Sequence, residues 1–354
     1  MKTRIGILTG GGDCPGLNAV IRAVVLTAEL RHGDEVIGYL DGWKGVLDDV
    51  SVPLDVVRCR DILTLGGTIL GTSRTNPFKI EGAPQRVQAN LTSAGIDALV
   101  AVGGEDTLGV AQRLGDLGVK AVGIPKTIDN DLSGTEVTFG FDTAVQIATE
   151  AIDRLRTTAE SHHRVIVCEV MGRNVAWIAT HAGIAGGAAE ILVPEVPFDV
   201  EAVCERLQRR HRGGQFSSIV VVSEGAVPAE RHPADLSGAV TPGTPGAPVD
   251  QFGHARLGGI GAWLAEEIEE RTGFEARVTI LGHIQRGGTP SAFDRVLATR
   301  FGVEAVGAVH DGDYGMMVAL QCGEIVRIPI ADAVAQPKTV DLDLYSSVAD
   351  TFLG

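Results

Sequence analysis

The chain has 354 residues, of which 44% are hydrophobic and 5% aromatic, and its formal net charge is -15. This length and apolar fraction allow a large buried core and favour two domains over one. The negative charge argues against nonspecific binding to nucleic acid or to anionic membranes, because a polyanion would meet long-range repulsion.

The five cysteines are scattered without a C-x-x-C pair, which fits neither a zinc site nor a disulfide framework. We therefore expect a reducing, cytoplasmic setting. The sequence shows neither the apolar run of a signal peptide nor a membrane-spanning segment, so export and membrane insertion are not expected.

Apolar runs of strand length alternate along the chain with stretches of helical period. The predicted strands are 4–8, 35–39, 98–102, 121–124, 164–170, 190–193, 218–223 and 277–281. The predicted helices are 17–31, 108–117, 143–158, 200–212, 258–271 and 291–309. This alternation predicts an α/β protein of two doubly wound domains with mostly parallel sheets, whose ligands lie at the carboxyl ends of the strands.

One segment interrupts the alternation. Residues 227–251, with PGTPGAP near the centre, are rich in proline and glycine and show no apolar period. We expect an exposed, mobile loop there.

A glycine-rich loop, GGGDCPG at 10–16, follows the first predicted strand and precedes a helix. Glycines let the backbone approach a phosphate, and a helix amino terminus adds partial positive charge. Pro15 interrupts a dinucleotide fingerprint, and no GK[ST] completes a Walker loop. The loop by itself fits a phosphate site and a tight turn equally well.

A second glycine-rich stretch, GGTILGTSRT at 66–75, carries Arg74 among small hydroxyl residues. A guanidinium group there suits a phosphate, since it can donate two parallel hydrogen bonds. Taken alone, a solvated loop arginine explains Arg74 as well.

Two acidic loops, GGEDT at 103–107 and PKTIDND at 125–131, each follow a predicted strand. Glu105 and Asp106 could simply begin a helix, where acids complement the dipole. Asp129 and Asp131, however, stand two residues apart beside Lys126. One carboxylate can accept a proton while the other holds a metal ion or the lysine.

These motifs, in this order and spacing, resemble the phosphofructokinase family over nearly the whole chain. The resemblance rests on GGGDCPGLNAVIR, GTSR, GGEDT, PKTIDND, HHRVIVCEVMGR, SEG and RVTILGHIQRGG. It implies transfer of a phosphoryl group to the 1-hydroxyl of fructose 6-phosphate, with Mg²⁺, in the phosphofructokinase fold. It places the phosphoryl donor in a domain of 1–140 with 285–335, and the sugar phosphate in a domain of 141–284 with 336–354.

The resemblance also implies roles for single residues. Asp129 is expected to be the general base, with Asp106, Lys126 and Asp131 as its catalytic neighbours, and Glu105 is expected to act on the metal. Many relatives have aspartate in place of Glu105, so the metal contact is either direct or through water. The donor phosphates are expected at Gly11, Gly12, Arg74 and Gly104.

The sugar phosphate is expected to contact a larger set of residues. These are Thr127, Ile128, Asp129, Arg164, Met171, Gly172, Arg173, Glu224, Arg277, His283, Ile284, Gln285 and Arg286. Arg164 and Arg277 are expected to reach the 6-phosphate from a neighbouring subunit, which implies a homo-oligomer, either dimer or tetramer.

The choice of donor depends on Asp106 and Lys126. Relatives that use ATP carry glycine at the position of Asp106 and commonly at that of Lys126, whereas the pyrophosphate-dependent branch resembles this chain at both. A carboxylate at Asp106 would repel the α-phosphate of a nucleotide. The expected donor is therefore pyrophosphate. An ATP-dependent enzyme of the same fold remains an alternative, as does a sugar-phosphate sensor without activity.

Regulation by nucleotides is not expected. Arg22 and Arg156 match two basic residues of the family's effector site, but Leu26, Gly213 and Gln215 stand where further basic residues belong. A pocket without those charges should bind a nucleotide poorly.

Overall fold

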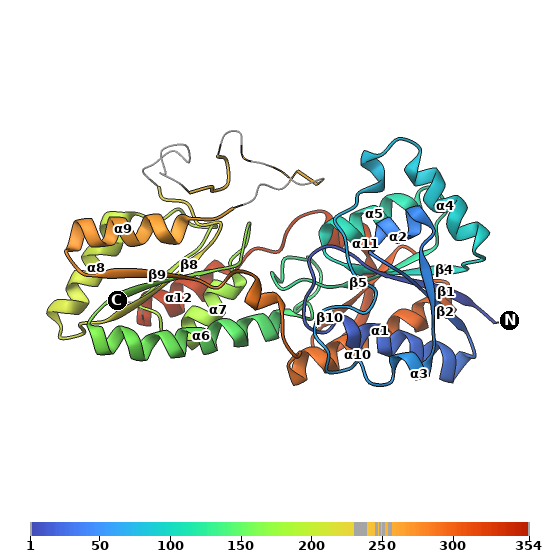
Figure 1. Ribbon diagram of the computed structural model, residues 1–354, viewed down its shortest axis with the longest axis horizontal. Coiled ribbons are helices and arrows are strands. Elements are labelled where there is room, and N and C mark those ends of the chain that lie inside the picture. The colour runs from blue at the N-terminus through green and yellow to red at the C-terminus, as the bar shows by residue number, and fades with distance from the viewer. Residues whose placement is uncertain are drawn as a thin grey trace. The chain divides into compact units, whose positions relative to one another are not determined.

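The structure is a computed structural model that describes residues 2–229, 239–244, 247, 249, 252–253 and 257–352, with the backbone alone at 349–352. The loop predicted over 227–251 lies largely outside the described residues. The chain divides into two compact units, Met1–Thr143 with Arg286–Pro337 and Ala144–Gln285 with Lys338–Gly354 (Figure 1).

The first unit is built on a seven-stranded sheet of order β11-β10-β5-β4-β1-β2-β3. Its strands are β1 (Arg4–Thr9), β2 (Glu35–Tyr39), β3 (Ser51–Leu54), β4 (Ala98–Gly103), β5 (Ala121–Pro125), β10 (Met316–Gln321) and β11 (Glu324–Pro329). All pairs are parallel except β2 with β3 and β10 with β11 at the two edges. The apolar strand β4 is buried along its whole length, as a central parallel strand covered on both faces requires.

Helices cover both faces of this sheet. They are α1 (Leu17–Thr27), α2 (Trp43–Asp48), α3 (Val56–Cys59), α4 (Ala83–Ser93), α5 (Glu105–Gly115), α10 (Ala292–Asp311) and α11 (Ile330–Val334). Helices α1 and α10 lie on one face, and α4 and α5 on the other (Figure 1). Gly302 allows α1 and α10 to approach closely, because a Cβ atom there would collide with Ala23 and the carbonyl of Val20.

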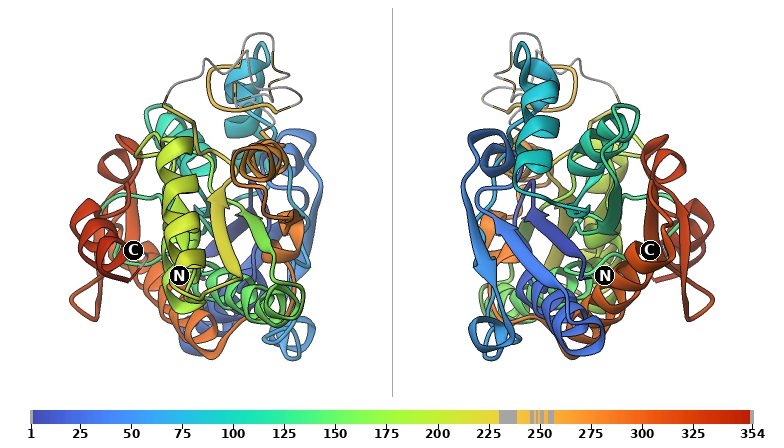
Figure 2. Two further views of the ribbon diagram at one scale, coloured as in Figure 1. Left: turned by 90° about the vertical axis from the view of Figure 1, so that its left-hand side faces the viewer. Right: turned by 90° about the vertical axis from the view of Figure 1, so that its right-hand side faces the viewer.

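The second unit contains a four-stranded sheet of order β7-β8-β6-β9, in which every pair is parallel. Its strands are β6 (Val165–Val170), β7 (Glu190–Leu192), β8 (Ser218–Ser223) and β9 (Ala276–Ile280). Its helices are α6 (Phe141–His162), α7 (Trp177–Ala185), α8 (Val200–Arg212), α9 (Ile260–Thr272) and α12 (Leu342–Phe352). Side views show the strands between layers of helices (Figure 2).

The structure confirms the predicted fold class, two doubly wound units with mostly parallel sheets. The eight predicted strands all form, with ends within about one residue of the expected positions. The hairpin β10–β11 and the helices α4 and α7 are elements that the sequence analysis did not identify. In the described part of the chain, no helix combines the length and the apolar character that crossing a membrane requires.

A buried acid holds the amino end of α6. The carboxylate of Asp294, on α10, accepts hydrogen bonds from the amide of Thr143 at 2.8 Å and from its hydroxyl at 2.5 Å. Asp294 has no exposed surface, and this burial raises its pKa to about 6. The helix therefore begins at a carboxylate that is costly to ionise.

Candidate active site

The loops that follow β1, β4 and β5 lie side by side at the carboxyl ends of these strands. The amide of Gly10 donates to Val102 at 2.9 Å, and the amide of Lys126 donates to Gly103 at 3.0 Å. The side chain of Thr107 packs so tightly against Gly10 and Gly103 that a Cβ atom at either glycine would overlap it. The glycine loop and the two acidic loops thus meet at one edge of the sheet.

Lys126 is almost completely buried beside the glycine loop. Its ammonium group donates to the carbonyl of Gly12. Burial lowers the pKa of Lys126, and the nearby guanidinium group of Arg286 lowers it further. The amino group of Lys126 is therefore fixed against the loop, where a bound anion would favour its charged form.

Arg286 also lies against the glycine loop. Its Nη1 donates to the carbonyl of Asp13 at 3.3 Å, and a Cβ atom on Gly12 would collide with its guanidinium group. Sequence analysis assigned Arg286 to the sugar phosphate. The structure places it in the first unit beside Gly11, Gly12 and Lys126, and its contact with a sugar phosphate stays a prediction.

The stretch that carries Arg74 pairs with the same loop. The amide of Gly11 donates to the carbonyl of Ser73 at 3.1 Å, and the hydroxyl of Thr72 donates to the carbonyl of Gly11 at 2.6 Å. Arg74 itself is exposed at the next position along the chain. Gly104 precedes α5 in an extended conformation, and a Cβ atom on it would lie 3.5 Å from the carbonyl oxygen of Lys126.

The two predicted catalytic aspartates follow β5 on a tightly fixed turn. Asn130, between them, adopts a left-handed conformation with φ 52°, and its side-chain oxygen accepts from the amide of Thr138. The hydroxyl of Thr127 accepts from the amide of Asp129 at 3.0 Å and also bonds the carboxylate of Asp131. Ile128 is fully buried. This turn therefore sets the positions of both carboxylates.

The resemblance implies a magnesium ion, and the carboxylates near α5 fit one. The Oδ1 atom of Asp131 is buried without a hydrogen-bond partner. Burial raises the pKa of Asp131, and the negative charge of Glu105 raises it further, so the two carboxylates are close enough to repel. No cluster of three or more metal-binding side chains occurs among the described residues. The neighbouring carboxylates of Asp131 and Glu105 suit Mg²⁺, which commonly takes one or two carboxylates and completes its shell with phosphate and water.

In the second unit, the loops after β6 and β8 form another group of predicted site residues. The amide of Glu224 donates to Val170 at 2.9 Å, and that of Gly225 donates to Gly172 at 3.1 Å. Gly172 has φ 143°, and Ser223 donates to its carbonyl at 2.5 Å. These bonds place Met171, Gly172 and Arg173 next to Glu224.

The turn Gly282–Arg286 follows β9 in the same sheet. His283 and Ile284 are exposed, whereas Gln285 is fully buried. The side-chain oxygen of Gln285 accepts from the amide of Met171 at 3.4 Å, and its nitrogen donates to Gly282 at 3.1 Å. Gln285 therefore supports the Met171 loop through its side chain, while His283 is free to contact a ligand.

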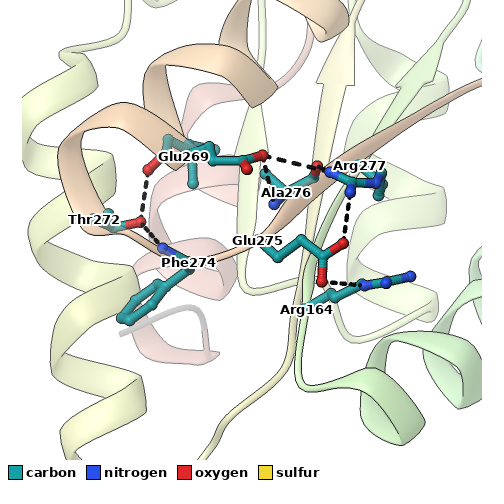
Figure 3. A network of polar contacts seen from close by, with 8 residues as sticks. Arg164, Glu269, Thr272, Phe274, Glu275, Ala276 and Arg277 are labelled. Carbon is teal, nitrogen blue, oxygen red and sulfur yellow. Dashed lines mark hydrogen bonds and ion pairs between the residues drawn. The ribbon is translucent and has the colours of Figure 1, made fainter.

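Arg164 and Arg277 lie at the opposite, amino ends of β6 and β9 (Figure 3). Nε of Arg164 is 2.8 Å from Oε2 of Glu275, and Nη2 of Arg277 is 2.5 Å from Oε1 of the same carboxylate. A strand of six residues such as β6 spans about 20 Å. Both arginines are thus remote from the Met171 loop of their own chain.

The structure therefore forms two groups of predicted site residues, one in each unit, and sets Arg164 and Arg277 apart from the group in their own unit. Thr72 and Thr107 were not among the predicted site residues, yet they hold the donor loops together through contacts with Gly11, Gly10 and Gly103. The only feature of the sequence that could have identified them is their place as hydroxyl residues beside a glycine motif.

Comparison with known proteins identifies the family. The model of the family described as "Phosphofructokinase" matches residues 4–309 of this chain. A pyrophosphate–fructose 6-phosphate 1-phosphotransferase of Streptomyces coelicolor is 58% identical over 99% of both chains, and an ATP-dependent 6-phosphofructokinase of Corynebacterium efficiens is 52% identical over 99% of both. The solved phosphofructokinase of Pichia pastoris is 32% identical with a TM-score of 0.82, covering 99% of this chain and 37% of its own. The chain belongs to the phosphofructokinase family.

Proposed function

We propose that this chain transfers a phosphoryl group from pyrophosphate to the 1-hydroxyl of D-fructose 6-phosphate, giving fructose 1,6-bisphosphate and phosphate. The relative of the same stated activity in Streptomyces coelicolor is 58% identical, which supports the assignment. The choice of donor is supported by two observations: Thr107, next to Asp106, packs against Gly10, and Lys126 donates to the carbonyl of Gly12.

Asp106 is the second residue of α5, and Thr107 next to it packs against Gly10. A carboxylate at this edge would repel the α-phosphate of a nucleotide, whereas pyrophosphate has no such group. Lys126, which donates to the carbonyl of Gly12, would balance the charge of the departing phosphate. Gly11, Gly12, Gly104 and Arg74 would hold the donor.

Asp129 is the proposed general base. Its carboxylate takes the proton of the sugar 1-hydroxyl while that oxygen bonds to the nearer phosphorus of pyrophosphate. The bond from this phosphorus to the bridging oxygen breaks, and the bridging oxygen leaves with the electron pair as part of phosphate. Glu105, with Asp131 beside it, would hold Mg²⁺, which neutralises charge on the donor phosphates.

The second unit supplies most of the proposed sugar-phosphate contacts. Glu224 suits sugar hydroxyls, and the loop Met171, Gly172 and Arg173 lies next to it. The exposed His283 is a further donor. Thr127, Ile128, Ile284, Gln285 and Arg286 complete the proposed set, Gln285 through its support of Met171.

We propose that Arg164 and Arg277 bind the 6-phosphate of a neighbouring subunit in a homo-oligomer. Their position at the amino ends of β6 and β9 supports this arrangement, because their own Met171 loop lies at the carboxyl end. We also propose a cytoplasmic location. The five cysteines are all free thiols, as a reducing compartment would keep them.

An ATP-dependent reaction is the second candidate, since relatives named for that activity are 52% identical. A coupled assay of the purified protein with fructose 6-phosphate and Mg²⁺ separates the two, with pyrophosphate and ATP compared at equal concentration. We expect turnover with pyrophosphate and little with ATP. A preference for ATP would overturn the donor assignment, and binding of fructose 6-phosphate without turnover on either donor would favour a sensor.

A further inference from the structure

Three successive carbonyl groups of the glycine loop accept hydrogen bonds from side chains of three different segments. The carbonyl of Gly11 accepts from the hydroxyl of Thr72, that of Gly12 from Lys126, and that of Asp13 from Arg286. The bond from Thr72 is short, at 2.6 Å. Each of these three peptide groups is therefore held in a fixed orientation.

The opposite ends of these peptide groups are the amides. Within the described part of the chain, the amides of Gly12 and Asp13 meet no acceptor. Successive backbone N–H groups that point the same way form a concave site for an anion. Each carbonyl that a side chain holds back keeps an oxygen lone pair away from that anion.

Of the three side chains, Thr72 alone carries no charge. Lys126 and Arg286 would attract a phosphate from any nearby position, so their substitution changes the charge as well as the loop. The hydroxyl of Thr72 acts on the loop only through the carbonyl of Gly11, and the amide of the same residue is held by Ser73 at 3.1 Å. Thr72 therefore isolates the effect of loop geometry on donor binding.

We propose that Thr72 is a positioning residue for the phosphoryl donor: its hydroxyl turns the peptide group that follows Gly11 so that the N–H of Gly12 faces the donor phosphate. This inference rests on the proposed function for the identity of the donor. The loop geometry itself is independent of whether that donor is pyrophosphate or a nucleotide.

The test replaces Thr72 by valine, which keeps the shape and removes the hydroxyl, and by serine, which keeps the hydroxyl. Pyrophosphate binding in the presence of Mg²⁺ is measured by calorimetry without the sugar, and KM for each substrate is measured in the full reaction. Thr92→Val is the control, because it removes a hydroxyl-to-carbonyl bond of 2.9 Å on α4.

We expect Thr72→Val to weaken pyrophosphate binding and to raise its KM by about tenfold, equivalent to about 1.4 kcal/mol. KM for fructose 6-phosphate should change less than about twofold, and Thr72→Ser should restore donor binding. Equal increases in both KM values, or an unchanged donor KM, would overturn the proposal. If the valine variant does not fold by circular dichroism, Thr72→Ala makes the same comparison.

Failure of the proposed function would look different. A wild-type enzyme that uses ATP and not pyrophosphate contradicts the donor assignment, whatever the Thr72 variants do. The role of Thr72 is then tested with ATP as the donor. The same tenfold rise in donor KM is expected, because it applies to any phosphate held by this loop.

Discussion

Replacement of Asp106 by glycine should shift the choice of phosphoryl donor from pyrophosphate toward ATP. Asp106 is half-buried at the second position of α5, and Thr107 beside it anchors the helix to Gly10 and Gly103. Its carboxylate therefore has little freedom to move away from a nucleotide. Removing it deletes both the negative charge and the bulk that would oppose an α-phosphate.

The size of the effect follows from Coulomb's law. Two unit charges about 4 Å apart interact by about 4 kcal/mol at an effective dielectric constant near 20, which is roughly a thousandfold in kcat/KM. The same substitution removes an acid from the first turn of α5 and introduces glycine, at a cost of about 1 to 2 kcal/mol in folding stability. A domain with the usual margin of about 5 to 15 kcal/mol remains folded.

The assay measures kcat/KM for pyrophosphate and for ATP at saturating fructose 6-phosphate and Mg²⁺, in wild type, Asp106→Gly and Asp106→Asn. The asparagine variant keeps most of the bulk and removes the charge, so it separates electrostatic from steric exclusion. Thermal melting of each variant controls for loss of folded protein.

A donor ratio that stays within about threefold of wild type in the glycine variant, or about 0.65 kcal/mol, would refute this reasoning. A large shift of the donor ratio in Asp106→Gly, with none in Asp106→Asn, would instead show that the bulk of the side chain, and not its charge, excludes the nucleotide. Some pyrophosphate activity should persist in either variant, because Lys126 remains against Gly12.

Asp129→Asn should lower kcat by at least about a hundredfold and leave fructose 6-phosphate binding intact, because it removes a proton acceptor; a variant with more than about a tenth of wild-type kcat would contradict the assignment. ADP and phosphoenolpyruvate should leave saturation by fructose 6-phosphate unchanged, since Leu26, Gly213 and Gln215 supply no charge; sigmoidal saturation relieved by ADP would count against this. The contribution of Asp294 to the free energy of unfolding should fall as pH rises from about 4 to about 6, because its pKa is higher when folded. In denaturant titrations, the difference in the free energy of unfolding between wild type and Asp294→Asn should change by up to about 3 kcal/mol over this pH range. A difference that does not depend on pH would disprove this prediction.

The sequence was most informative where an apolar run had to be buried. β4 and β8 are buried along their whole length, and such runs cannot be exposed loops. The hairpin β10–β11 was not predicted from the sequence. In the structure Cys322 and Gly323 both have positive φ, which fits a two-residue turn between strands. β11 is an edge strand with mixed exposure, so its apolar pattern is weak.

The candidate site could be predicted by residue but not by role. The motif GHIQRGG gave no reason to treat its members differently, yet the structure buries Gln285 and leaves His283 exposed. These differences depend on which backbone amide a side chain meets, and that amide belongs to Met171, distant in the sequence. Periodicity carries no information about such pairs.

The separation of Arg164 and Arg277 from the Met171 loop has a consequence for the concentration at which the enzyme works. Six residues of β6 lie between the two ends, and no change of side-chain rotamer spans that distance. If the 6-phosphate needs both ends, a lone protomer has only part of a sugar site. Catalysis then depends on encounter between chains, and specific activity should decline on dilution below the dissociation constant of the oligomer.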